Sequence, residues 1–238
     1  MKTIFSKTGY QKGMQCLKAL YLYKYHGKLR DPITEARLSR FEEGHAIGIK
    51  AQQLFPGGIL LRNNGPSRPA ADQRETQRMI ETGQGILYES AFIFNGVLVY
   101  NDILVKHTYG WHLYEVKSNQ LVKDHYIEDL ALQTYVVSSA GLPLHRSSLI
   151  HLRIPLDEIK EDMNVTDIFT ITDLTEECNN RQKTIEENIR KMQLTLSLRR
   201  VPDIAVGAHC DEPYACEFKG HCTQHPTEER SGLFSNIS

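Results

Sequence analysis

The chain has 238 residues, of which 40% are hydrophobic and 24% are charged. This length suits one large domain or a domain with an appendage, and the hydrophobic fraction suffices for a packed core. The sequence has no apolar run of membrane-spanning length and no signal-peptide-like stretch in residues 1–9, so we expect a cytoplasmic protein without membrane contact. The net charge of −1 does not indicate a nucleic-acid-binding protein, but it does not exclude one, because phosphate is bound by local basic patches.

The predicted elements run from helices to strands and back to helices. Helical patterns cover residues 10–25, 38–54 and 71–82, with a stop at 56–58 and a loop at 63–69. Strand patterns follow at 85–94, 97–105 and 111–117. A helix at 123–140, a strand at 147–153 and a packed helix at 184–198 come next, before a segment at 201–223 with little regular pattern. This order predicts the α/β class, with a central mixed sheet flanked by helices.

Two hairpins would align three acidic side chains across the predicted strands. Asn-Gly at 95–96 is a strong signal for a two-residue turn, and that turn places Glu89 opposite Asp102. A second turn centred near 108–109 places Asp102 opposite Glu115. Opposed residues of antiparallel strands share a face, with β-carbons about 5 Å apart. A slip of one residue in either turn would break this alignment.

The aligned acids, with Lys117 on the same face, are suited to a divalent cation. Adjacent carboxylates repel one another unless a cation lies among them, and carboxylates with open water positions suit Mg²⁺ or Mn²⁺. Strict alternation would surround Asp102 with apolar neighbours, which makes an unpaired charge costly: Leu98, Tyr100 and Leu104. The alternative is a solvated sheet face on which Glu115 and Lys117 merely pair. Two metal-binding carboxylates and a lysine ammonium on one surface are the side chains expected for hydrolysis of a phosphodiester.

Two helices offer additional polar side chains. His45 and Glu43 lie in the helix at 38–54, and a helix packed on the sheet would present one of them as a further metal ligand. The helix at 123–140 carries polar residues at successive i,i+4 positions: His125, Asp129 and Gln133. Gln133 and Tyr135 are candidates for orienting substrate or the lysine. The alternative for all of these is an ordinary polar helix surface.

The cysteines form a second candidate site. Cys210, Cys216 and Cys222 follow one another at a regular spacing, and Cys16 lies at the other end of the chain. Cysteines in a cytosolic protein favour metal binding or burial over disulfides. Four thiols suit a [4Fe–4S] cluster or Zn²⁺, and the absence of a Cys-x₂-Cys pair favours iron–sulfur. Zinc stays open because spare ligands lie nearby: His209, His221 and His225. Cys178 is predicted to be a free thiol.

Four segments together resemble a known group of nucleases. They are residues 15–22 (QCLKALYL), 102–104 (DIL), 114–118 (YEVKS) and 209–216 (HCDEPYAC). They resemble the PD-(D/E)XK nuclease superfamily, and more closely its RecB-type branch, which includes CRISPR-adaptation nucleases with an iron–sulfur cluster. The chain looks most similar to an uncharacterised bacterial family within that branch, over most of residues 4–223.

The resemblance implies a restriction-endonuclease-like core whose N- and C-terminal segments are joined by a cysteine-ligated cluster. By that resemblance Asp102 and Glu115 would hold Mg²⁺ or Mn²⁺, and we expect His45 and Val116 as further candidate ligands. By the resemblance Lys117 would position the attacking water or counter charge on the phosphorane. Strand register and helix position add Glu89, Gln133 and Tyr135 as further candidate site residues. The resemblance implies a [4Fe–4S] cluster on Cys16, Cys210, Cys216 and Cys222. Two family patterns are altered: Gly44 is followed by Gly48 where a histidine is usual, and Gln133 is followed by Tyr135 without the usual spacing.

These expectations amount to a single nuclease domain at 1–226, with a core at about 38–155, cluster-bearing flanks at 1–30 and 200–223, and a flexible tail at 227–238. The expected function is metal-dependent hydrolysis of DNA. The alternatives are a non-catalytic DNA-binding or assembly module that retains the fold, and a zinc-stabilised scaffold protein. Expected partners besides DNA are a helicase, CRISPR or phage-defence protein on a separate chain, or further copies of this chain.

Overall fold

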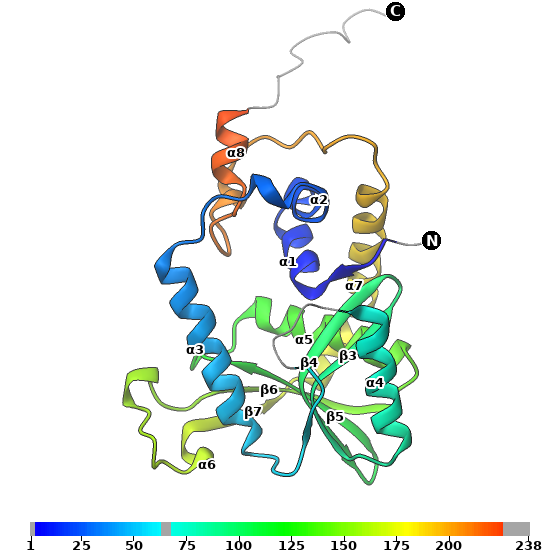
Figure 1. Ribbon diagram of the computed structural model, residues 1–238, viewed down its shortest axis with the longest axis vertical. Helices are drawn as coiled ribbons and strands as arrows, with labels where there is room; N and C mark the ends of the chain where they lie inside the picture. Colours follow the sequence, from blue (N-terminus) through cyan, green and yellow to red (C-terminus); the bar gives the residue numbers. More distant parts are fainter. Residues whose placement is uncertain (1–2, 63–67, 226–238) are drawn as a thin grey trace, which may run out of the picture.

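The computed structural model describes residues 3–62 and 68–225 and contains a seven-stranded mixed sheet (Figure 1). Six strands lie in the order β2-β3-β4-β5-β6-β7, and β1 pairs with β4 off this path. The strands are β1 (Phe5–Ser6), β2 (Ile59–Leu60), β3 (Ile86–Phe94), β4 (Val97–His107), β5 (Gly110–Lys117), β6 (Leu144–Leu152) and β7 (Phe169–Asp173). Helices flank this sheet, so the expected α/β class with a central mixed sheet is confirmed.

The two hairpins form with the predicted pairing. Asn95 and Gly96 have φ of 49° and 77°, the left-handed values that a two-residue turn of this kind requires. The pair Leu87↔Leu104 lies in the first hairpin and Leu104↔Leu113 in the second, as the turn positions predict. After β5 the chain crosses over through a helix and returns as β6, which pairs with β5 in parallel. The turns therefore set the alignment of the central strands.

Helices cover both faces and one edge of the sheet. They are α1 (Lys7–Gln15), α2 (Leu17–Tyr25), α3 (Glu35–Gln52), α4 (Pro69–Glu81), α5 (Asp124–Ser139), α6 (Val165–Ile168), α7 (Thr175–Leu196) and α8 (Lys219–Gln224). On one face, α1, α2, α5 and α7 share a core cluster with Leu87, Leu104 and Leu113. On the other, Ile47 and Ala51 of α3 pack in a cluster with Tyr114. The edge of β3 is covered by α4, where the Ala91 N–H donates to Thr76 Oγ1 at 2.9 Å.

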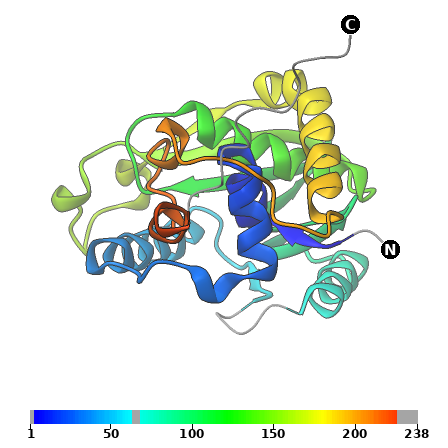
Figure 2. The same cartoon turned by 90° about the horizontal axis from the view of Figure 1, so that it is seen from above.

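The first predicted helix is interrupted, and this changes the direction of the chain. Residues 10–25 were expected to form one helix, but α1 ends at Gln15 and α2 begins at Leu17. Cys16 between them is extended, with φ −163° and ψ 122°. Figure 2 shows these two helices beside the C-terminal segment that carries the other three cysteines. The interruption thus lies where the two ends of the chain meet.

Other differences from the predicted elements are local. The short strands β1 and β2 and the later strand β7 were not predicted, and β1 and β7 extend the sheet beyond residues 38–155. Helix α7 begins at Thr175, nine positions before the predicted start at residue 184, because its first turns are largely polar and lack the apolar stripe that predicted it. Residues 63–67 of the predicted loop and the predicted tail at 227–238 lie outside the described residues. Within the described residues, no helix is both long and apolar enough to cross a bilayer.

The predicted alternation of β4 around Asp102 is wrong. Val97 and Val99 share a core cluster with Leu104, so the buried face changes parity between residues 99 and 104. Leu98 and Tyr100 therefore do not lie on the same face of the sheet as Leu104. The change coincides with an irregularity across the hairpin, where Glu89 has a φ of 55° and the ladder pairs the residues on either side of it while omitting it. A left-handed residue inside a strand rotates the following side chains.

Candidate active site

Asp102 and Glu115 meet where β4 and β5 separate. The ladder between the two strands ends at Ile103↔Tyr114. Beyond that pair, a side chain replaces the backbone as hydrogen-bond acceptor: Asp102 Oδ2 accepts a hydrogen bond of 2.7 Å from the Val116 backbone N–H. This contact holds the Asp102 carboxylate at the start of the Glu115-Val116-Lys117 run. Strand separation thus opens a place for side chains where a backbone ladder would otherwise continue.

Glu115 is the centre of the polar network. Its side chain is 3% exposed and is surrounded by donors from three different elements. Lys7 Nζ of α1 lies 2.8 Å from Oε1 and 3.0 Å from Oε2. Lys117 Nζ of β5 donates to Oε1 at 2.8 Å, and Gln133 Nε2 of α5 donates to Oε2 at 2.7 Å. A buried carboxylate requires this kind of compensation.

Lys117 joins the sheet to α5. Its ammonium donates at 2.8 Å to Asp129 Oδ2 as well as to Glu115, and it lies 5.0 Å from the centre of the Tyr126 ring. Gln11 of α1 donates to the other Asp129 oxygen at 2.7 Å. Burial opposes the charged form of Lys117, but the charges of Glu115 and Asp129 outweigh it and hold its pKa well above the ordinary value. Lys117 is therefore a fixed positive charge.

The acids of the site act on one another. Burial, followed by the charge of Glu115, raises the pKa of Asp102 well above its ordinary value. Burial likewise raises the pKa of Glu89, which also feels Glu115. Burial alone would raise the pKa of Glu115, but the ammonium groups of Lys117 and Lys7 outweigh it and hold that pKa well below its ordinary value. Glu89, Asp102 and Glu115 are thus close enough to repel, as expected for a site that takes a cation.

The donor set suits a hard divalent cation, although its side chains are not yet arranged around one. Carboxylate oxygens are ligands of Mg²⁺ and Mn²⁺, and Asp102, held by the Val116 N–H, and Glu115 supply two carboxylates to this site. Across residues 3–62 and 68–225, no group of three or more His, Cys, Asp or Glu side chains is already placed to hold a metal ion. Lys7 is the cation that Glu115 contacts instead. Metal binding at these residues would therefore require side chains to rearrange.

The remaining predicted residues differ in whether they join this polar network. His45 is exposed on α3, and its charge reaches Glu89. Glu43 accepts a hydrogen bond of 2.9 Å from Ser39 on the same helix. Tyr135 is not brought into the network, because its hydroxyl lies 3.4 Å from Asn95 Nδ2 at the first hairpin turn. Gln133 is brought in, through its contact with Glu115.

Lys7 and Gln11 were not identified from the sequence. Each contacts a partner more than 100 positions away, so no local pattern reveals the contact. The spacing of Lys7, Gln11 and Gln15 is nevertheless a helical i,i+4 series on one face, which is a weak signal for a shared role. Gln15 continues the series towards the cysteines, donating to the backbone oxygens of His209 at 2.9 Å and Tyr214 at 2.6 Å.

The four predicted cluster ligands line one small cavity. Cys16, Cys210, Cys216 and Cys222 surround a space of about 10 Å³ and are free thiols. Cys210 and Cys216 are buried in a small cluster with Phe218, against which Cys16 and Cys222 pack. Burial raises the pKa of the Cys216 and Cys222 thiols, and the charge of a neighbouring lysine opposes this rise at each. Cys178 lies apart, buried in the main core cluster.

Comparison with known proteins finds likenesses among solved structures only, and two of them are described here. No protein-family model matches the chain, and no curated protein matches it. Two solved structures are similar over 82% of this chain at 11% identity and a TM-score of 0.32. One is LHK-Exo in complex with dAMP, 89% of whose chain is covered. The other is a phage-related exonuclease from Haemophilus somnus 129PT, 93% of whose chain is covered.

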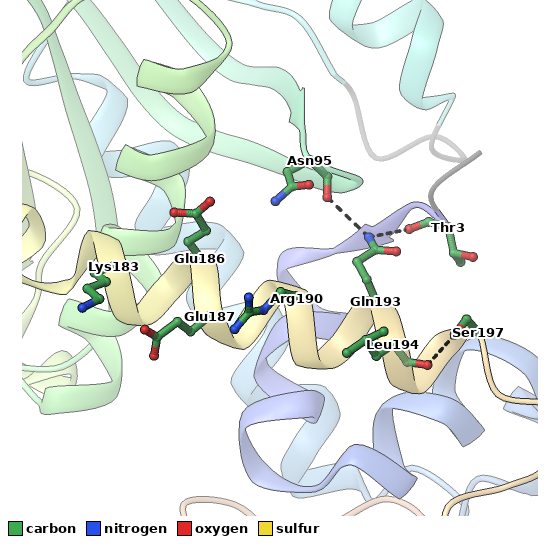
Figure 3. A pocket seen from close by; sticks show the side chains of 9 residues that line it. All are labelled: Thr3, Asn95, Lys183, Glu186, Glu187, Arg190, Gln193, Leu194 and Ser197. Carbon is green, nitrogen blue, oxygen red and sulfur yellow. Dashed lines mark hydrogen bonds between the residues drawn. The ribbon is translucent and has the colours of Figure 1, made fainter.

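A larger cavity lies elsewhere on the molecule. It has a volume of about 720 Å³ and lies between α7 and the first hairpin turn (Figure 3). Its lining is polar and of mixed charge, including Lys183, Glu186, Glu187 and Arg190 of α7. It includes neither Asp102 nor Glu115 among its lining residues. This cavity therefore lies apart from the interacting side chains around Asp102 and Glu115. We take those side chains, and not the cavity, as the candidate active site.

Proposed function

We propose that this chain is a metal-dependent nuclease that hydrolyses the phosphodiester bonds of DNA. The observation that carries the proposal is the meeting of Asp102, Glu115 and Lys117 where β4 and β5 separate, with Asp102 held by the Val116 N–H. Hydrolysis adds water across a P–O bond and leaves a phosphate monoester and a hydroxyl group. A Glu115–Lys117 ion pair with only a structural role on a solvated sheet face would not need Asp102, a second and partly buried carboxylate, beside it.

Asp102, Glu115 and the Val116 carbonyl would hold Mg²⁺ or Mn²⁺. A bound divalent ion supplies Lewis-acid polarisation of the scissile phosphate. Lys117 supplies a fixed positive charge where negative charge develops on the phosphorane, and Asp129 orients it for that task. Gln133 holds Glu115 in place from α5. His45, exposed on α3 within electrostatic reach of Glu89, is the candidate for a ligand from the helical side.

The cysteines would hold a structural [4Fe–4S] cluster, with Zn²⁺ as the alternative occupant. Support comes from the convergence of Cys16 with three C-terminal cysteines around one cavity. Two lysines provide charge that favours anionic ligands there: Lys12 acts on Cys216, and Lys18, which is 8% exposed, acts on Cys222. Such a centre would close most of the chain into one loop, which makes a structural role the default.

A nuclease assay tests the proposal. Protein purified without oxygen is incubated with end-labelled single- and double-stranded DNA in Mn²⁺, alongside Lys117→Ala and the matched control Lys160→Ala at an exposed position. We expect wild type and Lys160→Ala to cleave, and Lys117→Ala to be slower by about 100-fold or more. No cleavage by folded wild type would favour a DNA-binding module, and equal cleavage by Lys117→Ala would remove that residue from the mechanism.

A further inference from the structure

The hydrogen-bonding capacity of Glu115 is already full. An ionised carboxylate offers about four lone-pair positions on its two oxygens. Lys7 reaches both oxygens, Lys117 takes a second position on Oε1, and Gln133 takes a second on Oε2. A metal ion can bind Glu115 only after one of these donors withdraws. The identity of that donor decides how the site is loaded.

Lys117 and Gln133 are each held by a second contact. Lys117 also bonds Asp129 Oδ2 at 2.8 Å, so removing it from Glu115 leaves it tied to α5. Gln133 has no exposed surface, and its Nε2 also lies 3.3 Å from the Asp129 backbone oxygen. Lys7 differs from both. Among the described residues its hydrogen bonds go to Glu115 alone, and its side chain is 22% exposed, which leaves it a route to solvent.

Lys7 also lies among the acids that would bind a metal. The charges of Glu115, Asp102 and Asp129 all act on its ammonium group. A lysine ammonium is a compact point charge on a flexible stem, so it can stand where a small cation would stand and leave without moving its backbone. It therefore neutralises the same carboxylates that a divalent ion would neutralise.

The helix that carries Lys7 is fixed. The N–H of Gly9 donates to the Ser6 side chain at 3.2 Å, which caps the helix start. A side chain at Gly9 would meet Phe5 at 3.3 Å, and one at Gly13 would meet Met192 at 2.7 Å, so α1 is closely packed on both. With the helix held, withdrawal of Lys7 is a change of its side chain only.

We propose that Lys7 is an internal cation that occupies the metal position and must withdraw before a divalent ion can bind Asp102 and Glu115. The proposal rests on the proposed function, because it takes these two carboxylates as the metal ligands. Lys7 then weakens metal binding and sets the ion concentration at which the site fills. It also offsets the mutual repulsion of Glu89, Asp102 and Glu115 in the metal-free protein.

Calorimetric titration with Mn²⁺ alone tests the proposal on the full chain. The variants are Lys7→Met, Lys7→Arg and the matched control Lys191→Met, an exposed lysine of α7. Removing a unit charge a few ångströms from the ion should tighten Mn²⁺ binding by about tenfold or more in Lys7→Met. Lys7→Arg and Lys191→Met should not bind tighter than wild type. Equal or weaker binding by folded Lys7→Met would overturn the proposal.

A second measurement uses the wild-type chain and so does not depend on how a variant folds. Surface lysines are acetylated briefly with and without Mg²⁺, and the extent at each lysine is read by peptide mass spectrometry. We expect acetylation of Lys7 to rise several-fold with Mg²⁺, because the ion releases its ammonium from Glu115, while Lys191 stays constant. Unchanged or reduced acetylation of Lys7 in protein shown to bind the ion would refute the proposal.

The two proposals fail differently. Glu115→Gln is titrated with Mn²⁺ in the same series, and its loss of binding shows that the ion uses this carboxylate. If wild type and Glu115→Gln bind Mn²⁺ identically, the metal site itself is wrong and the proposed function falls. If Glu115→Gln loses binding while Lys7→Met matches wild type, the metal site stands and only the role of Lys7 is rejected.

Discussion

Asp129 of α5 accepts a hydrogen bond of 2.8 Å from the ammonium of Lys117, twelve positions before it on β5. The same carboxylate accepts from Gln11, so it links the strand that carries the lysine to two helices. Asp129 lies 4% exposed and orients Lys117 without standing among the proposed metal ligands. The contact makes α5 part of the site's geometry.

Asp129→Asn should therefore slow DNA cleavage while leaving substrate binding nearly unchanged. Loss of an orienting partner of this kind reduces activity by about 10–100-fold in metal sites. We expect the loss in kcat, with KM within a few-fold of wild type. The matched control is Asp124→Asn on the same helix, whose side chain is 83% exposed and pairs with Arg181. A change in KM with kcat intact would assign Asp129 to substrate binding instead.

Replacing Cys210 should empty the cysteine centre. Cys210→Ala removes one of four converging thiols, and we expect the metal content of anaerobically purified protein to fall together with its thermal stability. Cys178→Ala, at a buried cysteine outside the cavity, should retain the metal. Iron and sulfide analysis with visible absorbance makes the measurement: a brown protein contains an iron–sulfur cluster and a colourless one with zinc contains the alternative. Equal metal content in Cys210→Ala would contradict the assignment.

His112 should make a destabilising contribution in mildly acidic solution, opposite in sign to that of Asp102, whose pKa is raised. Burial, and then the charges of His107 and Arg146, lower its pKa to about 4 from an ordinary value of 6.5. The unfolded chain takes up this proton below about pH 6.5 and the folded chain only below about pH 4, so stability is lost as pH falls through that window. Urea unfolding of wild type and His112→Gln at pH 7 and pH 5 isolates this contribution, because between the two pH values the wild type should lose stability relative to the variant. An unchanged difference in the variant would reject His112 as a source.

Two glycine substitutions should move stability in opposite directions. A Cβ at Gly58 would overlap Tyr88 Cζ, and that tyrosine ring is buried and bonded to the backbone through its hydroxyl, so it cannot easily move aside. Gly58→Ala should cost about 1–3 kcal/mol through overpacking. A Cβ at Gly48, inside α3, would meet nothing within 4 Å, so Gly48→Ala should stabilise by about 0.5–1 kcal/mol. Urea unfolding of both variants tests the pair.

The sequence predicts the central hairpins well because turn chemistry acts locally. Asn95 and Gly96 adopt left-handed conformations that few other residue pairs tolerate, and this fixes which residues face each other across β3 and β4. The second turn likewise fixes the pairing of β4 with β5, and Asp102 and Glu115 lie one position beyond its last pair, Ile103↔Tyr114. Turn residues and strand periodicity contain this information within about twenty positions.

The parts that the sequence does not predict depend on contacts between distant segments. Glu89 has a positive φ although nothing in its neighbours requires it, and the buried face of β4 changes with it. Lys7 reaches Glu115 from 108 positions away. The interruption of the first helix at Cys16 likewise lies where the C-terminal segment packs. A pattern of hydrophobic residues along the sequence does not reveal contacts between segments that meet only in the folded chain.

The most direct test of the account is single-turnover DNA cleavage in saturating Mn²⁺ by wild type, Asp102→Asn and the exposed control Asp157→Asn. Asparagine keeps the shape of Asp102 and removes its charge, so folding can be matched while the proposed metal ligand is lost. The account predicts that wild type and Asp157→Asn cleave at similar rates and that Asp102→Asn is slower by about 1,000-fold. Cleavage by Asp102→Asn at the wild-type rate would contradict it.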